Sequence, residues 1–132
     1  MILNLITIAI LALTPQVQDK PVEYKARITY YSHNSDKYGS HVADPNVKRA
    51  KHGITVSAHP DFKFGTEIEI PELEKQFGDG KFIVQDRGSA VTKKRATRGK
   101  AYVFDVYVED PKLVVKYSNE LPEYMVVKVT KN

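Results

Sequence analysis

The chain has 132 residues, which suits one domain and leaves little room for a second. Hydrophobic residues make up 42% and charged residues 27%, a balance that predicts a folded rather than a disordered chain. The formal net charge of +4 favours anionic partners without naming one, and the absence of cysteine excludes disulfides and thiolate metal sites.

The chain begins with an apolar segment. Residues 2–13 are interrupted only by Asn4 and Thr7, a run too short for a transmembrane helix but typical of the apolar region of a signal peptide. We therefore interpret residues 1–20 as a signal peptide or an N-terminal membrane anchor plus a linker. This interpretation predicts an exported protein of the periplasm, the cell envelope or the extracellular space. No Lys or Arg precedes Lys20 and no clear cleavage site follows, so a buried N-terminal strand stays open as the alternative.

From Glu23 onward, short alternating runs separated by turn residues predict a mainly β domain over residues 21–132. In the first run Tyr24, Ala26, Ile28 and Tyr30 share one parity, which is typical of a half-buried strand. Further strands are predicted at residues 54–58, 66–70, 81–86, 102–109 and 123–130. Six strands in an open sheet would expose edges that bind other chains, so we predict closure into a small barrel.

Two long loops and one short helix complete the prediction. Residues 32–53 are polar and contain glycine, with a candidate helical turn at residues 45–49, and residues 87–100 form a strongly basic loop. Asp110 followed by Pro111 is a helix start signal, and Pro122 ends the helix. The apolar stripe of this helix consists of Leu113, Val114, Tyr117 and Leu121.

Two carboxylates lie where the strand patterns predict burial. Asp86 ends the strand at residues 81–86, and Asp105 lies in the middle of the strand at residues 102–109. Burial raises the pKa of an aspartate above its ordinary value of about 3.9, which is the property that a general acid needs near neutral pH. A structural role as a cap, turn anchor or ion-pair partner is the alternative for each, and the spacing does not say whether the two side chains are neighbours.

The order of several motifs resembles the three-aspartate domain, a family that includes membrane-bound lytic transglycosylase A and is related to rare lipoprotein A. The motifs are Gly65-Thr66 with two alternating isoleucines behind it, residues 84–90 (Val-Gln-Asp-Arg-Gly-Ser-Ala) and residues 103–107 (Val-Phe-Asp-Val-Tyr). Residues 28–32 and 53–58 are similar to the first two strands of the family. The resemblance covers residues 27–108, and it implies a six-stranded double-psi β-barrel.

The resemblance also implies a reaction: cleavage of the β-1,4 bond between N-acetylmuramic acid and N-acetylglucosamine in peptidoglycan, without a cofactor. It implies that Asp105 is the catalytic acid/base and that Asp86 lines the same cleft. Asp105 would protonate the glycosidic oxygen and then take the proton of the sugar's own 6-hydroxyl, leaving a 1,6-anhydro end. Ordinary hydrolysis needs a second carboxylate, which Asp86 could supply. A non-catalytic glycan-binding barrel is the alternative from a different functional class.

We expect substrate contacts from six further residues: Tyr31, Thr66, Arg87, Gly88, Ser89 and Tyr107. Tyrosine rings at residues 30, 31 and 38 could stack on sugars or pack at the barrel rim. Arg87, Gly88 and Ser89 offer a cation and backbone N–H groups for a substrate oxygen.

The chain departs from the family pattern at its first aspartate. His59-Pro60 occupies that place, and Asp61 is a candidate substitute two residues later. A basic segment at residues 93–100 replaces a shorter connection; it is either a solvated loop or a surface that captures an anionic polymer. These departures bear on activity more than on fold.

Other ligands are disfavoured. The four histidines (His33, His41, His52 and His59) match no ligand spacing, so no metal site is predicted. Export and the lack of aromatic residues among the cations argue against nucleic acid. We expect a monomer whose partner is peptidoglycan or another anionic cell-wall glycan.

Overall fold

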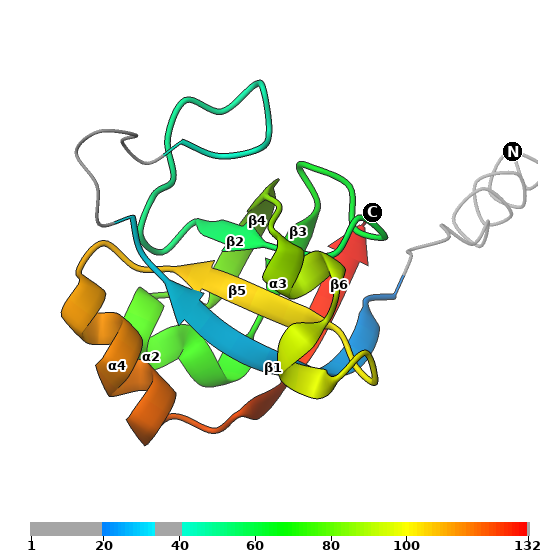
Figure 1. The fold of residues 1–132 in the computed structure, drawn as a ribbon. Coiled ribbons are helices and arrows are strands. Elements are labelled where there is room, and N and C mark those ends of the chain that lie inside the picture. Colours follow the sequence, from blue (N-terminus) through cyan, green and yellow to red (C-terminus); the bar gives the residue numbers. More distant parts are fainter. Residues whose placement is uncertain (1–19, 34–40, 132) are drawn as a thin grey trace, which may run out of the picture.

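Six strands close into a barrel in the computed structural model, which describes residues 20–33 and 41–131 (Figure 1). In chain order the strands are β1 (Val22–Tyr31), β2 (Thr55–Ser57), β3 (Glu67–Glu69), β4 (Lys81–Asp86), β5 (Val103–Tyr107) and β6 (Tyr124–Lys131). The prediction of a mainly β, six-stranded closed barrel is confirmed. The barrel lies within the predicted domain. The strand β4 has its predicted limits, and β2, β3 and β5 are shorter than predicted. The strand β1 begins one residue before the predicted run, and β6 is shifted by one residue towards the C-terminus.

The N-terminal prediction lies largely outside the described residues. Residues 1–19, including the apolar run at residues 2–13, are not described, and neither is Tyr38. In the described part of the chain, no helix has the length and apolar character needed to cross a membrane.

The strands follow the order β1-β5-β2-β4-β3-β6 around the barrel, and β6 pairs back onto β1. β1 pairs with β5 and β2 with β4 in parallel, whereas the other four pairings are antiparallel. This mixed topology places β5, from late in the chain, directly between β1 and β2. Strands that carry the resemblance motifs therefore lie side by side, although they are far apart in sequence.

Strand alternation separates an inner face from an outer face. Ile28 lies opposite Phe104 and Tyr30 opposite Val106, and all four side chains belong to the hydrophobic core. The core also includes Val56, Ile68, Phe82, Val84, Met125, Val127 and Val129. Because successive residues of a strand point to opposite faces, the residues between these, among them Asp105, lie on the outer face of the barrel.

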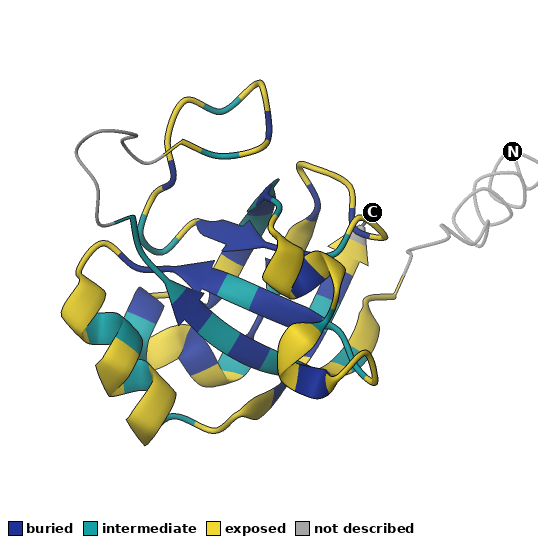
Figure 2. Ribbon diagram, in the orientation of Figure 1, coloured by how far each residue is buried: buried dark blue, intermediate teal, exposed yellow. Residues whose placement is uncertain are grey.

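The predicted helix is present as α4 (Pro111–Glu120). The side chain of Asp110 accepts a hydrogen bond from the backbone N–H of Lys112 at 2.9 Å, as expected of an N-cap. The predicted stripe packs against the core, and the Tyr117 ring lies 5.5 Å from that of Tyr30. Figure 2 shows the opposite side of α4 exposed, so this helix covers one side of the barrel.

The expectation of a single short helix is wrong, because two further short helices are present among the described residues. α2 (Glu74–Phe77) follows a 3₁₀ turn (Pro71–Leu73), and α3 (Ser89–Thr92) precedes another (Arg95–Thr97). These helices are too short for a helical period to show in the sequence; single buried residues anchor them instead, namely Leu73, Phe77, Val91 and Thr97.

One glycine is required by this packing. Gly80 has a φ of +67°, and a Cβ atom there would lie 2.6 Å from the carbonyl oxygen of Ile70. Any other residue would clash with backbone, so the turn between α2 and β4 depends on glycine at this position.

Candidate functional site

Four side-chain positions form a row across neighbouring strands of the barrel, which we name the carboxylate row. Thr29 on β1 lies opposite Asp105 on β5, and Asp105 lies opposite Ser57 on β2. Ser57 in turn lies opposite Asp86 on β4, because the register shifts between Val56 and Ser57 and skips Gln85. The structure therefore brings the two aspartates to either side of one strand position, a proximity that sequence spacing could not show.

Asp105 is half-buried, and its carboxyl group is held by a neighbouring hydroxyl. Its Oδ1 accepts a hydrogen bond from the hydroxyl of Thr29 at 2.9 Å. Burial raises the pKa of Asp105 to about 6; the Thr29 hydrogen bond opposes the rise, and the nearby negative charge of Asp86 adds to it. Ion pairs among the described residues include Arg27–Glu123 and His59–Asp61, and no described basic residue pairs with Asp105. Such a carboxyl group can hold and release a proton near neutral pH.

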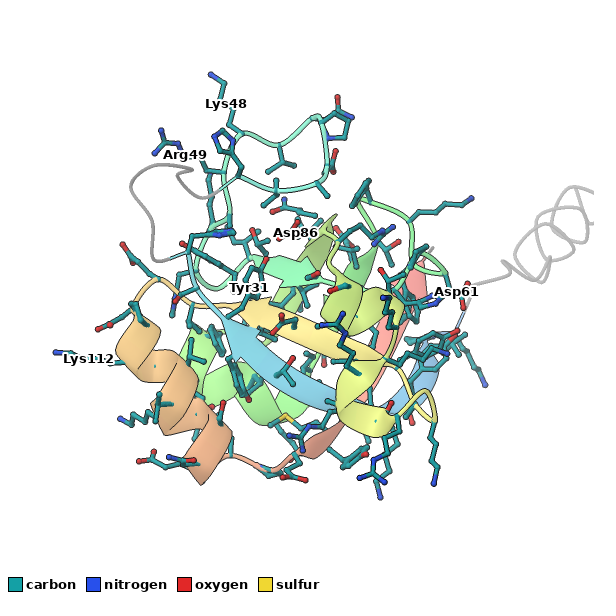
Figure 3. All side chains as sticks on the ribbon, viewed as in Figure 1. Tyr31, Lys48, Arg49, Asp61, Asp86 and Lys112 are labelled. Atoms are coloured by element: carbon teal, nitrogen blue, oxygen red, sulfur yellow. The ribbon has the colours of Figure 1, made fainter. Side chains whose placement is uncertain are left out.

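Asp86 is buried and held by three donors. Its Oδ1 accepts from the backbone N–H groups of Ala43 and Arg87, both at 2.9 Å. Its Oδ2 accepts from the Tyr31 hydroxyl at 2.7 Å. Figure 3 shows Tyr31 and Asp86 close together near the end of β5. Asp86 is therefore a fixed hydrogen-bond acceptor that contributes negative charge next to Asp105.

The rings of Tyr31, His33 and Tyr107 contact one another beside Asp86. The ring of Tyr31 lies 5.5 Å from Tyr107 and 5.6 Å from His33, and His33 lies 5.6 Å from Tyr107. Burial, together with Asp86, raises the pKa of Tyr31 far above its ordinary value, so Tyr31 stays protonated and donates to Asp86. The Nε2 atom of His33 is buried without a hydrogen-bond partner among the described residues.

Arg87 is engaged with the protein backbone. Its guanidinium group donates to the carbonyl oxygens of Ala58 at 3.0 Å and Phe62 at 2.6 Å, and it lies 4.2 Å from the centre of the Phe64 ring. Burial lowers the pKa of Arg87, while the charges of Asp44 and Asp86 oppose this change. The arginine therefore ties the turn after β2 to the end of β4, and the structure gives these donors to the protein rather than to a ligand.

Four other residues are predicted to contact substrate, namely Thr66, Gly88, Ser89 and Tyr107, and each has a different place in the structure. Gly88 precedes α3 in an extended conformation, and Ser89 is the exposed first residue of that helix. The hydroxyl of Thr66 donates to the carbonyl oxygen of Lys63 at 2.6 Å, inside its own turn. Tyr107 is buried next to Tyr31. Substrate contact by any of them stays a prediction.

Asp61 does not join the two aspartates. Its carboxylate accepts from the Tyr102 hydroxyl at 2.5 Å and lies 3.4 Å from Nδ1 of His59. Figure 3 shows Asp61 well apart from Asp86 and Tyr31. A different aspartate contacts the strand next to Asp86: Asp44 is buried and donates its backbone N–H to the carbonyl oxygen of Gln85 at 3.0 Å.

Sequence reasoning missed four residues of this region: Thr29, His33, Asp44 and Ser57. Thr29 and Ser57 have the outward parity of their strands, so a register prediction could have found them. Asp44 begins an Asp-Pro-Asn turn, in which its Oδ1 accepts from the Asn46 N–H at 3.0 Å. His33 stands out in the sequence only as a possible metal ligand. In residues 20–33 and 41–131, no three acidic or histidine side chains come together in a way that could hold a metal ion.

The basic segment lies apart from the row. Within it, Lys94 places its Nζ atom 4.5 Å from the centre of the Tyr102 ring, next to Asp61. Three cavities lined by described residues lie elsewhere on the barrel, and none of these three includes Asp86 or Asp105. Of the two aspartates, Asp105 lies between the inward-facing Phe104 and Val106 and so faces outward, whereas Asp86 is buried at the end of β4.

No protein-family model and no curated protein matches this chain. Membership of the three-aspartate family therefore stays a prediction that rests on the motifs alone. The geometry nevertheless joins those motifs: the strand of the first motif, residues 66–70, pairs with the strand that ends in Asp86, and Asp86 and Asp105 flank Ser57.

Proposed function

We propose that this protein is a lytic transglycosylase-like enzyme of peptidoglycan, with Asp105 as its single acid/base. The observation that carries the proposal is the state of Asp105, a half-buried carboxyl group with a pKa of about 6 and no cationic partner in the described part of the chain. A protonated carboxyl near neutral pH can give its proton to a leaving oxygen.

The proposed reaction needs one carboxyl group and no water. Asp105 gives its proton to the glycosidic oxygen as the bond to the muramic acid C1 breaks. The resulting carboxylate takes the proton of the same sugar's 6-hydroxyl, whose oxygen forms the new bond to C1. The products are a new hydroxyl end and a 1,6-anhydro end, and Asp105 is again protonated.

Other residues of the row support this chemistry. Thr29 orients the Asp105 carboxyl through its hydrogen bond. Asp86, fixed by Tyr31 and two backbone N–H groups, supplies negative charge that helps Asp105 keep its proton. The same charge favours a positively charged sugar transition state. Hydrolysis is the minor version of this proposal, with Asp86 as the second carboxylate.

The motif resemblance and the apolar segment at residues 2–13 support the location and the substrate. A peptidoglycan-active enzyme must lie outside the cytoplasm, and a signal peptide or membrane anchor would take it there. The net charge of +4 suits an anionic cell-wall polymer.

A non-catalytic glycan-binding barrel is the second candidate. The observation that favours it is the pair of partly exposed rings, Tyr31 and His33, supported from below by the buried Tyr107, because aromatic rings stack well on sugars. His59 at the place of the family's first aspartate also favours binding without cleavage.

Mass spectrometry of purified glycan strands after incubation with the protein separates these functions. We expect anhydro-terminated fragments from the native protein and none from the Asp105→Asn variant. Asp110→Asn is a matched control, because asparagine caps a helix as well as aspartate does. New reducing ends would identify a hydrolase, and an unchanged polymer that retains the protein would contradict catalysis and identify a binder.

A further inference from the structure

A cavity of about 520 Å³ lies next to the carboxylate row and is lined by cations. Its lining consists of Asn46, Val47, Lys48, Arg49, Lys51, Ile54 and Gln85. We name it the cationic cavity. Gln85 immediately precedes Asp86 on β4, so the cavity and the candidate site are neighbours along that strand. Figure 3 shows Lys48 and Arg49 on the loop beyond Asp86 and Tyr31, with their charged ends directed outward.

The wall of the cationic cavity is held by a chain of hydrogen bonds. The backbone N–H of Lys51 donates to the Thr55 hydroxyl at 2.8 Å, and that hydroxyl donates to Oε1 of Gln85 at 2.6 Å. The carbonyl oxygen of Gln85 accepts from the Asp44 N–H at 3.0 Å. These bonds fix the loop that carries the cations against β4, so the cavity has a defined position relative to Asp86.

The charges of the cavity are uncompensated within the described residues. Neither Lys48, Arg49 nor Lys51 takes part in an ion pair there, and no acidic residue lines the cavity. Ile54 also lines a second cavity of about 530 Å³, whose charged lining residues are Glu67, Glu69, Asp79 and Lys81. The lining of the second cavity is acidic on balance and that of the cationic cavity is wholly basic, so an anion is attracted more strongly to the cationic cavity.

We propose that the cationic cavity binds carboxylate groups of the peptide stem carried by the glycan strand. This inference rests on the proposed function, because it takes the strand to be cleaved at Asp105. In peptidoglycan the peptide hangs from muramic acid, beside the bond that would be broken. Lys48, Arg49 and Lys51 would hold its carboxylates, and the exposed Ile54 would contact its apolar side chains.

Binding is measured by fluorescence anisotropy with labelled, phosphate-free glycan strands, using Asp105→Asn as the background so that no strand is cleaved. On this background the cavity variant replaces Lys48, Arg49 and Lys51 by Gln. The matched control replaces Lys75, Lys112 and Lys116 by Gln, which removes the same charge from exposed positions on α2 and α4. We expect the cavity variant to bind about tenfold more weakly than the background at low salt, and the control to bind as the background does.

A second arm uses strands whose carboxylates have been converted to neutral amides. Here we expect the background and cavity variants to bind equally weakly, because the charges that the cavity recognises are gone. Equal loss in the cavity and control variants, or no loss in the cavity variant, would overturn the proposal. A difference between the variants that survives amidation unchanged would overturn it as well.

Failure of the proposed function is distinguishable from failure of this inference. Backbone amide shifts in NMR spectra are followed while a triglutamate peptide is added to the full chain, without any glycan. We expect the shifts of Asn46, Lys48, Arg49, Lys51 and Gln85 to move, and those of residues 93–100 to stay in place. Shifts confined to residues 93–100 would assign the anion to the other basic segment and overturn the inference, whatever the glycan assay shows.

Discussion

Thr29 and Asp105 are direct neighbours in the parallel pair β1–β5, and the Thr29 hydroxyl donates to Oδ1 of Asp105 at 2.9 Å. Burial raises the pKa of Asp105 to about 6, and this hydrogen bond keeps it from rising further. The two residues together therefore determine the pH range over which the carboxyl group carries a proton.

Replacing Thr29 by Val should raise the pKa of Asp105. Valine has nearly the same shape as threonine but no hydroxyl, so the carboxylate loses the donor that stabilises its charged form. NMR titration of the Asp105 carboxyl carbon measures this change. Thr29→Ser is the matched control, since it keeps a hydroxyl, and its pKa should stay near the native value. An unchanged pKa in Thr29→Val would contradict the assigned hydrogen bond.

Asp105 should also make the protein less stable as the pH rises. Its pKa is about 6 in the folded protein and about 3.9 in the unfolded chain, so the folded state binds more protons between these values. The stability due to Asp105 is complete below the unfolded pKa and is lost as the pH rises through the folded pKa. The loss is roughly 2 kcal/mol between pH of about 4 and about 7.

Urea unfolding of the native protein and Asp105→Asn at several pH values checks this effect. As the pH rises towards neutral, the free energy of unfolding of the native protein should fall relative to that of Asp105→Asn. Parallel curves for the two proteins would show that Asp105 has an ordinary pKa.

Replacing Asp86 by Asn should lower the pKa of Asp105 and weaken the fold. The pKa falls because the neighbouring negative charge is gone. The asparagine has one acceptor oxygen where the carboxylate offers two, so at least one of the three donors loses its partner, at a cost of about 1–3 kcal/mol. Tyr31→Phe, which removes only one donor and no charge, is the control. A raised pKa of Asp105 in Asp86→Asn would contradict the proposed coupling.

Replacing Arg87 by Lys should destabilise the barrel by about 2 kcal/mol. The guanidinium donates to two carbonyl oxygens and stacks on Phe64, and an ammonium group cannot reproduce this flat, forked contact. Chemical unfolding measures the loss, with Arg95→Lys as a control on an exposed arginine. If stability stays native while glycan binding falls, Arg87 contacts substrate instead.

The fold was largely predictable because alternation is a strong signal. The parity of Tyr24, Ala26, Ile28 and Tyr30 indicated the buried face of β1, and the limits of β4 agree with the predicted strand. The short helices were not predicted, because α2 and α3 each depend on one or two buried side chains such as Phe77 and Val91. Four residues are too few for a period to appear.

The site was predictable only in part. Asp86 and Asp105 stand out as carboxylates in apolar strands, but their proximity depends on β2 pairing with both β4 and β5. That pairing is a long-range property that local patterns do not encode. Arg87 was predicted to contact substrate as a cation that could hold a substrate oxygen, yet the structure directs its guanidinium towards Ala58 and Phe62. The direction of a long side chain depends on its tertiary neighbours.

The most direct test of Asp105 as acid/base is the pH dependence of anhydro-end formation, measured as kcat/KM for the native protein and for Thr29→Val. We expect activity to fall as the pH rises, with an apparent pKa near that of Asp105, about 6. In Thr29→Val the fall should move to higher pH, together with the NMR pKa. A fall that stays at the same pH in the variant, or no anhydro ends at any pH, would contradict the account.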